Sequence, residues 1–92
     1  MSELSALAAA VGALLKERGA TVAVAESSTG GLISAALLAQ GGASVYVRGG
    51  AVVYTREAKQ RLGGVSDADM ARERAATETH ALVLARSIRE RM

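Results

Sequence analysis

Apolar residues recur along the chain with two different periods, and the change between them separates helices from strands. From residue 4 to residue 15 they return every three or four positions, which predicts an amphipathic helix that Gly19 ends. Residues 21–25 instead alternate branched and small apolar side chains, as a buried strand does. A tight turn over 27–31 and a second helix over about 30–40 are expected next. The apolar stripe of the first helix consists of Leu4, Leu7, Val11, Leu14 and Leu15.

The second half of the chain predicts one more strand and three helices. Residues 50–54 have clear β character, whereas 44–47 fit either a short helical turn or the start of a strand. Side chains that can cap helices stand at three places, and Asp69 completes a capping-box pattern at the second of them: Thr55, Ser66 and Thr77. The helix that follows the last cap is expected to bury a stripe made of Ala81, Leu84, Ala85 and Ile88.

The sequence predicts four or five helices but only two strands with convincing signals, and this small number of strands limits the folds that are possible. The two strands are joined by a helix, so they predict a β-α-β unit of an α/β fold. Both strands read as central, and a sheet covered by helices on both faces ordinarily needs more than two strands. We therefore expect the 92 residues to be the N-terminal portion of a longer domain. The alternative is that another chain supplies the missing strands.

Composition narrows the class of protein. Half of the residues are hydrophobic, yet Phe and Trp are absent, so Ala, Val and Leu must build the core. No cysteine is present, which excludes disulfides and thiolate metal sites and fits a cytoplasmic location. No segment resembles a signal peptide or a membrane span, so no membrane partner is expected. The net charge of +2 is spread among interleaved acids and bases without stacking aromatics, and this favours a solvated surface over a nucleic-acid site.

The densest chemistry lies where the first strand gives way to a helix, in the segment Ala-Glu-Ser-Ser-Thr-Gly-Gly-Leu at 25–32. Backbone N–H groups at a helix start are unpaired, and they can bind a phosphate, a carboxylate or a developing oxyanion. The ordinary alternative is a capped turn whose glycines permit close packing. A cap uses one oxygen, however, and this turn offers a carboxylate and three hydroxyls. We therefore treat it as a candidate site.

The residues whose chemistry could cooperate are Ser27, Tyr54 and Lys59. In a parallel β-α-β unit the turn after the first strand and the end of the second strand meet at one edge of the sheet, where α/β folds bind ligands. A neutral lysine can accept the proton of a serine, as in Ser-Lys amidohydrolases. The ordinary alternatives are an exposed lysine and a tyrosine that packs at the strand end. His80 is assigned to the surface or to helix capping, and no second His or Cys accompanies it for a metal site.

Two blocks of this sequence together resemble a known family. They are the Ala-Glu-Ser-Ser-Thr-Gly-Gly turn at 25–31 and the Gly-Ala-Val-Val-Tyr-Thr-Arg-Glu-Ala-Lys run at 50–59, followed by Leu-Gly-Gly-Val at 62–65. In order and spacing the chain is similar, from about Leu4 onward, to the CinA C-terminal domain family, which includes the nicotinamide mononucleotide deamidases known as PncC. The resemblance implies a three-layer α/β/α domain. Residues 1–92 would be a partial domain of this amidase-like type, truncated after the first β-α-β unit and the following helices.

The resemblance also implies an activity: hydrolysis of the carboxamide of nicotinamide mononucleotide to nicotinic acid mononucleotide and ammonia, without a metal or other cofactor. By matching position Ser27 would be the nucleophile and Lys59 its general base, with Tyr54 near the site. Glu26 would orient the serine or the lysine, or would be a structural hydrogen-bond acceptor. The residues implied in substrate binding are Glu26, Ser28, Thr29, Gly30 and Gly31, of which Ser28 stands where many relatives have Cys.

The same comparison implies a missing half. Family members continue for roughly as many residues again, through a Gly-x-Ala-Gly-Pro segment and further strands that have no counterpart in these 92 residues. The alternative to an amidase is therefore a catalytically inactive, truncated homologue that acts as a binding or oligomerisation module. A homo-oligomer is the expected assembly.

Overall fold

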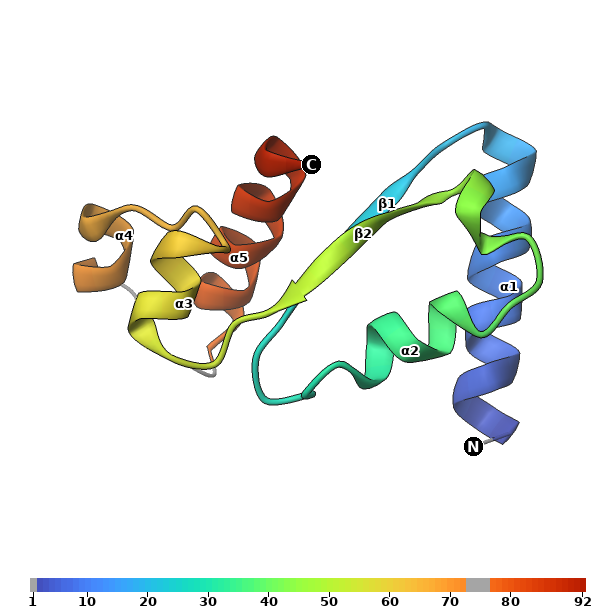
Figure 1. The fold of residues 1–92 in the computed structure, drawn as a ribbon, viewed down its shortest axis with the longest axis horizontal. Coiled ribbons are helices and arrows are strands. Elements are labelled where there is room, and N and C mark those ends of the chain that lie inside the picture. Colours follow the sequence, from blue (N-terminus) through green and yellow to red (C-terminus); the bar gives the residue numbers. More distant parts are fainter. Residues whose placement is uncertain (1, 73–76) are drawn as a thin grey trace.

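The elements of the protein follow the order predicted from the sequence (Figure 1). The structure is a computed structural model that describes residues 2–72 and 77–92. Figure 1 shows α1 and α2 gathered at one end of the molecule and α3, α4 and α5 at the other, with the strand pair running between them. The bounds are α1 Ser2–Arg18, β1 Val22–Glu26, α2 Leu32–Leu38, the 3-10 turn η1 Ala43–Val45, β2 Val47–Val52, α3 Arg56–Arg61, α4 Asp67–Arg72 and α5 Glu78–Arg91.

Strands β1 and β2 pair in parallel, and α2 lies on the connection between them. The register runs from Val22 opposite Val47 to Glu26 opposite Val52. One more hydrogen bond, donated by the N–H of Val53 to the carbonyl of Glu26 at 2.7 Å, follows the last pair. The two strands therefore end at the same edge, as the β-α-β pattern predicted. The ambiguous stretch 44–47 contains both predicted forms, because η1 is followed at once by the start of β2.

Helices cover both faces of this sheet. Side chains alternate between the faces of a strand, and in β1 Val22 and Val24 pack with residues of α1 and α2. Val47 of β2 lies opposite Val22 and packs on the same side, because the register is irregular between Val22 and Ala23 and the alternation of β2 shifts by one residue there. Ala25 and Ala51 instead pack with residues of α5 and of the segment after β2. Gly50 of β2 faces α2, because a Cβ there would lie 2.6 Å from the Val24 carbonyl oxygen and 3.3 Å from the Ser34 hydroxyl oxygen. The expected α/β/α layering is therefore confirmed, with a small parallel sheet in the middle.

The buried apolar residues form two clusters, one on each side of the strand pair. We call them the α5 cluster (Val53, Val65, Val83 and Leu84) and the α2 cluster (Ala8, Ala36 and Leu37). The predicted aliphatic core is therefore confirmed. Tyr46 and Ile88 are large apolar side chains buried outside these clusters. Tyr46 lies against α1 because Gly12 has no side chain there: a Cβ would come within 2.5 Å of the Tyr46 hydroxyl oxygen.

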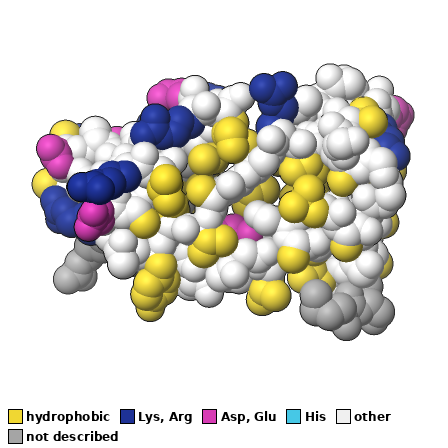
Figure 2. Space-filling model, viewed as in Figure 1, with side chains coloured by type: hydrophobic (Ala, Val, Ile, Leu, Met, Phe, Trp, Pro, Cys, Tyr) yellow, Lys and Arg dark blue, Asp and Glu magenta, His cyan; other side chains and the backbone are white. Residues whose placement is uncertain are grey.

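Two predicted stripes differ from the structure. In α1 the side chain of Leu7 is 63% exposed, and Val11 and Leu14 are exposed as well. This helix packs on the short helix α2 through the small Ala8, so its larger apolar residues remain on the surface. Figure 2 shows hydrophobic side chains at several separate places on the visible face. In α5 the buried stripe is shifted by one position: Leu84 and Ile88 are buried as predicted, Val83 and His80 are buried in addition, and Ala81 and Ala85 are exposed.

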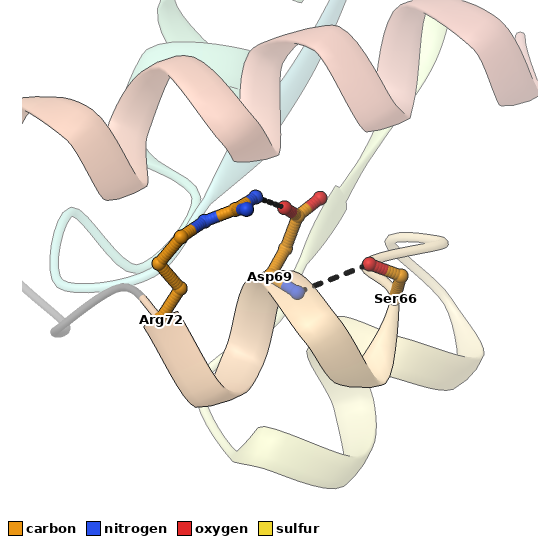
Figure 3. Close-up of polar contacts among 3 residues, drawn as sticks. All are labelled: Ser66, Asp69 and Arg72. Atoms are coloured by element: carbon orange, nitrogen blue, oxygen red, sulfur yellow. Dashed lines mark hydrogen bonds and ion pairs between the residues drawn. The ribbon is translucent and has the colours of Figure 1, made fainter.

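The predicted helix caps are confirmed in their hydrogen bonds. The hydroxyl of Thr55 accepts from the N–H of Ala58 at 3.1 Å, and the hydroxyl of Thr77 accepts from the N–H of His80 at 3.2 Å. Figure 3 shows the third cap, in which the hydroxyl of Ser66 accepts from the N–H of Asp69, whose carboxylate also pairs with Arg72. These contacts are local, which is why sequence spacing predicts them.

Candidate functional site

The Ser27 turn leaves β1 and reverses the chain before α2. Its backbone is closed by two hydrogen bonds, from the N–H of Gly30 to the carbonyl of Ser27 and from the N–H of Leu32 to the carbonyl of Thr29, both at 3.1 Å. Gly30 and Gly31 have φ angles of 63° and 98°, a left-handed backbone that other residues rarely adopt. The paired glycines are therefore required by the path of the turn.

Glu26 is the last residue of β1, and its side chain is only 2% exposed. One carboxylate oxygen accepts from the Thr29 hydroxyl at 2.8 Å and from the N–H of Ile33 at 2.9 Å, and the other accepts from the N–H of Ser34 at 2.8 Å. Burial alone would raise the pKa of this carboxyl, but hydrogen bonds from the Ser34 side chain and backbone, the Ile33 backbone and Thr29 outweigh it and lower the pKa to about 2. Glu26 is thus ionised and anchored to the start of α2.

This anchoring corrects one expectation from the sequence. The N–H groups of Ile33 and Ser34 were expected to be unpaired and ready for a phosphate or an oxyanion, and the carboxylate of Glu26 occupies both. Of the two interpretations of Glu26, the structural acceptor accounts for these contacts. An anion at the first turn of α2 would also face this negative charge, so substrate contacts from the turn must come from its hydroxyls and its other backbone groups.

A cavity of about 220 Å³ lies between the Ser27 turn and the beginning of α5. It forms because α5 packs against β1 and so brings the first turns of α5 opposite the turn that leaves this strand. Ser27 is half-buried there. The lining consists of Ala25, Glu26, Ser27, Ser28 and Thr29 on one side and Thr77, His80, Ala81 and Leu84 on the other.

His80 is the lining residue that sequence reasoning missed. Its side chain is 3% exposed, so the predicted surface position is wrong, although its N–H does take part in the cap made by Thr77. One signal could have revealed it. His80 lies four residues before Leu84 and eight before Ile88, so the buried stripe of α5, extended back by one turn, reaches it.

Tyr54 and Lys59 both follow β2 in the chain, Tyr54 directly after the strand and Lys59 in α3. Lys59, in α3, is 4% exposed, so the exposed lysine considered as its alternative is wrong. Its carbonyl accepts from the N–H of Val65 at 3.1 Å. Tyr54 is 73% exposed, so a tyrosine that packs at the strand end is wrong too. Among the residues that the structure describes, neither lines the cavity: Ser27 shares it with His80 instead.

The described residues form neither a cluster of metal ligands nor a helix that could span a membrane. Over residues 2–72 and 77–92, no three His, Cys, Asp or Glu side chains converge as a metal site requires. No helix within the same ranges combines the length and apolar character of a transmembrane span.

Comparisons with known proteins give a consistent result. A family model described as the CinA C-terminal domain matches residues 4–92. The CinA-like protein of Gloeobacter violaceus is 44% identical over 86 residues, which are 94% of this chain and 20% of that protein. The CinA superfamily protein of Escherichia coli has a TM-score of 0.87 at 30% identity, covering 96% of this chain and 51% of that one. The competence/damage inducible protein of Agrobacterium tumefaciens has a TM-score of 0.85 at 34% identity, with 96% and 53% covered. The chain thus spans about a fifth of the curated relative and about half of each solved chain.

Proposed function

Because the chain belongs to the CinA C-terminal domain family, we propose that it serves amide hydrolysis, with nicotinamide mononucleotide as substrate, Ser27 as nucleophile and Lys59 as general base. The observation that carries the proposal is the position of Ser27, half-buried in a cavity at the carboxyl end of two parallel strands. Ligands of open α/β sheets bind at this edge. In this proposal the site works in the cytoplasm and needs no metal or other cofactor.

The chemistry follows from the two side chains. The hydroxyl oxygen of Ser27 attacks the carboxamide carbon while its proton passes to the amine nitrogen of Lys59. Lys59 then gives that proton to the departing nitrogen, so that ammonia leaves and an ester of Ser27 remains. Water hydrolyses the ester by the reverse proton path, and the carboxylic acid is released. One amide and one water give one acid and one ammonia.

The strand ends supply the support for pairing Ser27 with Lys59. The hydrogen bond between Val53 and Glu26 holds the two strand ends together, and Ser27 is the next residue after one of them. Thr55 caps α3 two residues after Val53, and Lys59 follows within that helix. A buried lysine is also rare unless the fold makes use of it.

Ammonia release from nicotinamide mononucleotide tests the proposal. Ser27→Ala removes the nucleophile, and Lys59→Met removes the amine while keeping a long side chain; we expect each to lower the rate at least about a hundredfold. Ser44→Ala and Lys16→Met are matched controls that lie away from the cavity, and they should keep the rate. Circular dichroism confirms folding in every case. A folded Ser27→Ala protein that keeps the rate would exclude Ser27 as nucleophile, and a folded but inactive parent chain would exclude the amidase.

A binding or oligomerisation module is the second candidate, and the exposed stripe of α1 favours it. Leu7, Val11 and Leu14 lie on the surface of that helix, where a second copy of the chain would cover them. We expect the mass in solution, measured by light scattering, to be that of a homo-oligomer, and Leu7→Asp to reduce it to the monomer. A monomeric parent chain at every concentration would refute this candidate.

A further inference from the structure

Strand β2 has an open edge. The N–H of Val53 donates to Glu26 of β1, so Val53 faces β1, and successive residues of a strand turn their backbone groups to opposite sides. The N–H and C=O groups of Gly50 and Val52 therefore point away from β1. In the described part of the chain the sheet consists of β1 and β2 alone, so no further strand pairs with these groups. An unpaired strand edge is a template for another strand.

Exposure distinguishes this edge from the opposite one. On β1 the residues whose backbone groups point outward are Ala23 and Ala25; both are half-buried, and α5 packs against that strand. On β2 the alternate residues Arg48, Gly50 and Val52 are all exposed. An added strand therefore reaches β2 more readily than β1.

A hollow of about 140 Å³ lies along β2 on the face that α2 covers. Gly50 lines it from the strand, and Ser34 and Leu38 line it from the helix. Gly50 has no side chain to fill the hollow, and Leu38 beside it is 59% exposed. The lining is mostly apolar, so an apolar side chain from a neighbouring strand fits it best.

The chain carries a matching side chain two residues away. Val52 is 49% exposed, and it lies on the same face of β2 as the hollow, because a Cβ on Gly31 at the start of α2 would come within 3.3 Å of its side chain. When an edge strand pairs with its own copy about a two-fold axis perpendicular to the sheet, the two strands run antiparallel and each face continues across the pair. An axis at Ala51 places Val52 of each copy opposite Gly50 of the other.

We infer that two copies of this chain pair antiparallel along β2, with Ala51 on the two-fold axis and Val52 of each copy in the Gly50 hollow of the other. The outward N–H and C=O groups of Gly50 and Val52 gain partners, and the two strand pairs become one sheet of four strands. The pairing covers exposed Val52 and Leu38. Arg48 stands three residues from the axis, so the arginines of the two copies lie at opposite ends of the pairing and like charges do not meet.

This contact is separate from the α1 stripe, and it goes beyond the proposed function because it does not depend on amide hydrolysis. One short strand and one side chain from each copy form it. Contacts this small belong to weak and transient complexes. A covalent trap therefore detects the pairing better than the mass in solution does.

The absence of cysteine from the chain makes such a trap specific. In Ala51→Cys the two introduced thiols face each other across the axis in a non-hydrogen-bonded pair, where Cα atoms are about 4.5 Å apart and a disulfide can form. We expect oxidised glutathione to give a disulfide-linked dimer at least about tenfold faster than in Ser44→Cys, whose position is exposed but lies outside the pairing. Circular dichroism confirms that both variants are folded.

Further variants in the Ala51→Cys background test the register. Val52→Lys brings a charge to the hollow and should slow cross-linking at least about tenfold, whereas Val52→Thr keeps the branched shape and should stay within about threefold of the Ala51→Cys rate. Leu7→Asp should leave the rate unchanged, since α1 takes no part in this contact. The parent chain gives a second measurement without cysteine: hydrogen exchange of the Gly50 and Val52 amides should slow as the protein concentration rises.

Each result decides the matter. Cross-linking of folded Ala51→Cys that is no faster than that of Ser44→Cys would overturn the inference and leave the edge to another polypeptide or to water. Equal rates for Val52→Lys and Val52→Thr would refute the fit of Val52 in the hollow, and loss of cross-linking in Leu7→Asp would assign the contact to α1.

Hydrogen exchange decides the matter if Ala51→Cys fails to fold. Amides of Gly50 and Val52 that exchange equally fast at low and high concentration of the parent chain would overturn the inference. None of these measurements involves ammonia release, so the proposed amidase stands or falls separately.

Discussion

Replacing Glu26 by Gln tests whether its carboxylate holds the Ser27 turn on α2. The substitution keeps the size of the side chain but removes the charge and turns one acceptor into a donor. That donor would face the N–H of Ser34 or of Ile33, which now donate to the carboxylate at 2.8 and 2.9 Å. A buried N–H without an acceptor loses a full hydrogen bond, so the change should destabilise the fold.

The magnitude follows from the pKa of this carboxyl. It falls from the ordinary 4.5 to about 2 in the folded protein. A difference of about 2.5 pKa units corresponds to a stabilisation of roughly 3 kcal/mol for the ionised form. Because the folded pKa is the lower one, this stabilisation is present above about pH 4.5 and is lost as the pH falls toward about 2. A Gln side chain does not titrate, so it lacks this contribution at every pH.

The assay is urea unfolding followed by circular dichroism, for the parent and for Glu26→Gln. We expect the free energy of unfolding to differ by about 3 kcal/mol near neutral pH and the two proteins to converge as the pH falls toward about 2. Glu57→Gln is the matched control. Its carboxylate pairs with Arg61 at 3.3 Å on the surface, and its loss should cost less than about 1 kcal/mol. A Glu26→Gln difference that is under about 1 kcal/mol, or that stays constant with pH, would refute the reasoning.

Two further substitutions test the turn and the core by the same unfolding assay. Gly30→Ala should destabilise the fold by about 1–2 kcal/mol, because a Cβ there meets no atom within 4 Å and only the left-handed φ of 63° opposes it. Gly41→Ala is the control. A Cβ on Gly41 is equally free of contacts and its φ is not left-handed, so this substitution should be neutral or slightly stabilising. Equal effects at the two glycines would contradict this account. Ile88→Val should cost about 1 kcal/mol because its side chain is buried on α5, and an unchanged unfolding midpoint would mean that this helix does not pack as described.

The parts of the fold that depend on neighbouring residues were predictable from the sequence. Thr55, Ser66 and Thr77 bond to N–H groups three residues further on, so their spacing alone identifies them. The pairing of the two strands follows as directly, because a helical connection of this length joins parallel strands.

What depends on packing was not predictable in this way. The burial of His80 and the exposure of Leu7 follow from which helix covers which face, and the periodicity of a helix leaves that choice open. The contacts of Glu26 reach seven and eight residues ahead, and they require the exact path of the left-handed turn at Gly30 and Gly31. The sequence therefore predicted the turn and its carboxylate. It also predicted that the N–H groups at the start of α2 would bind a ligand, whereas in the structure they donate to Glu26.

Because the core is divided into two clusters, the cavity stays assembled only while both clusters are folded. Its first wall, the Ser27 turn, is anchored by Glu26 to the start of α2, which packs in the α2 cluster. Its second wall is part of α5, which packs through Leu84 in the α5 cluster. Regions with separate cores can open separately, each with its own free energy. Partial unfolding of either end of the molecule would therefore take the cavity apart while the opposite end stayed folded, so the lifetime of the assembled cavity is set by the less stable of the two clusters.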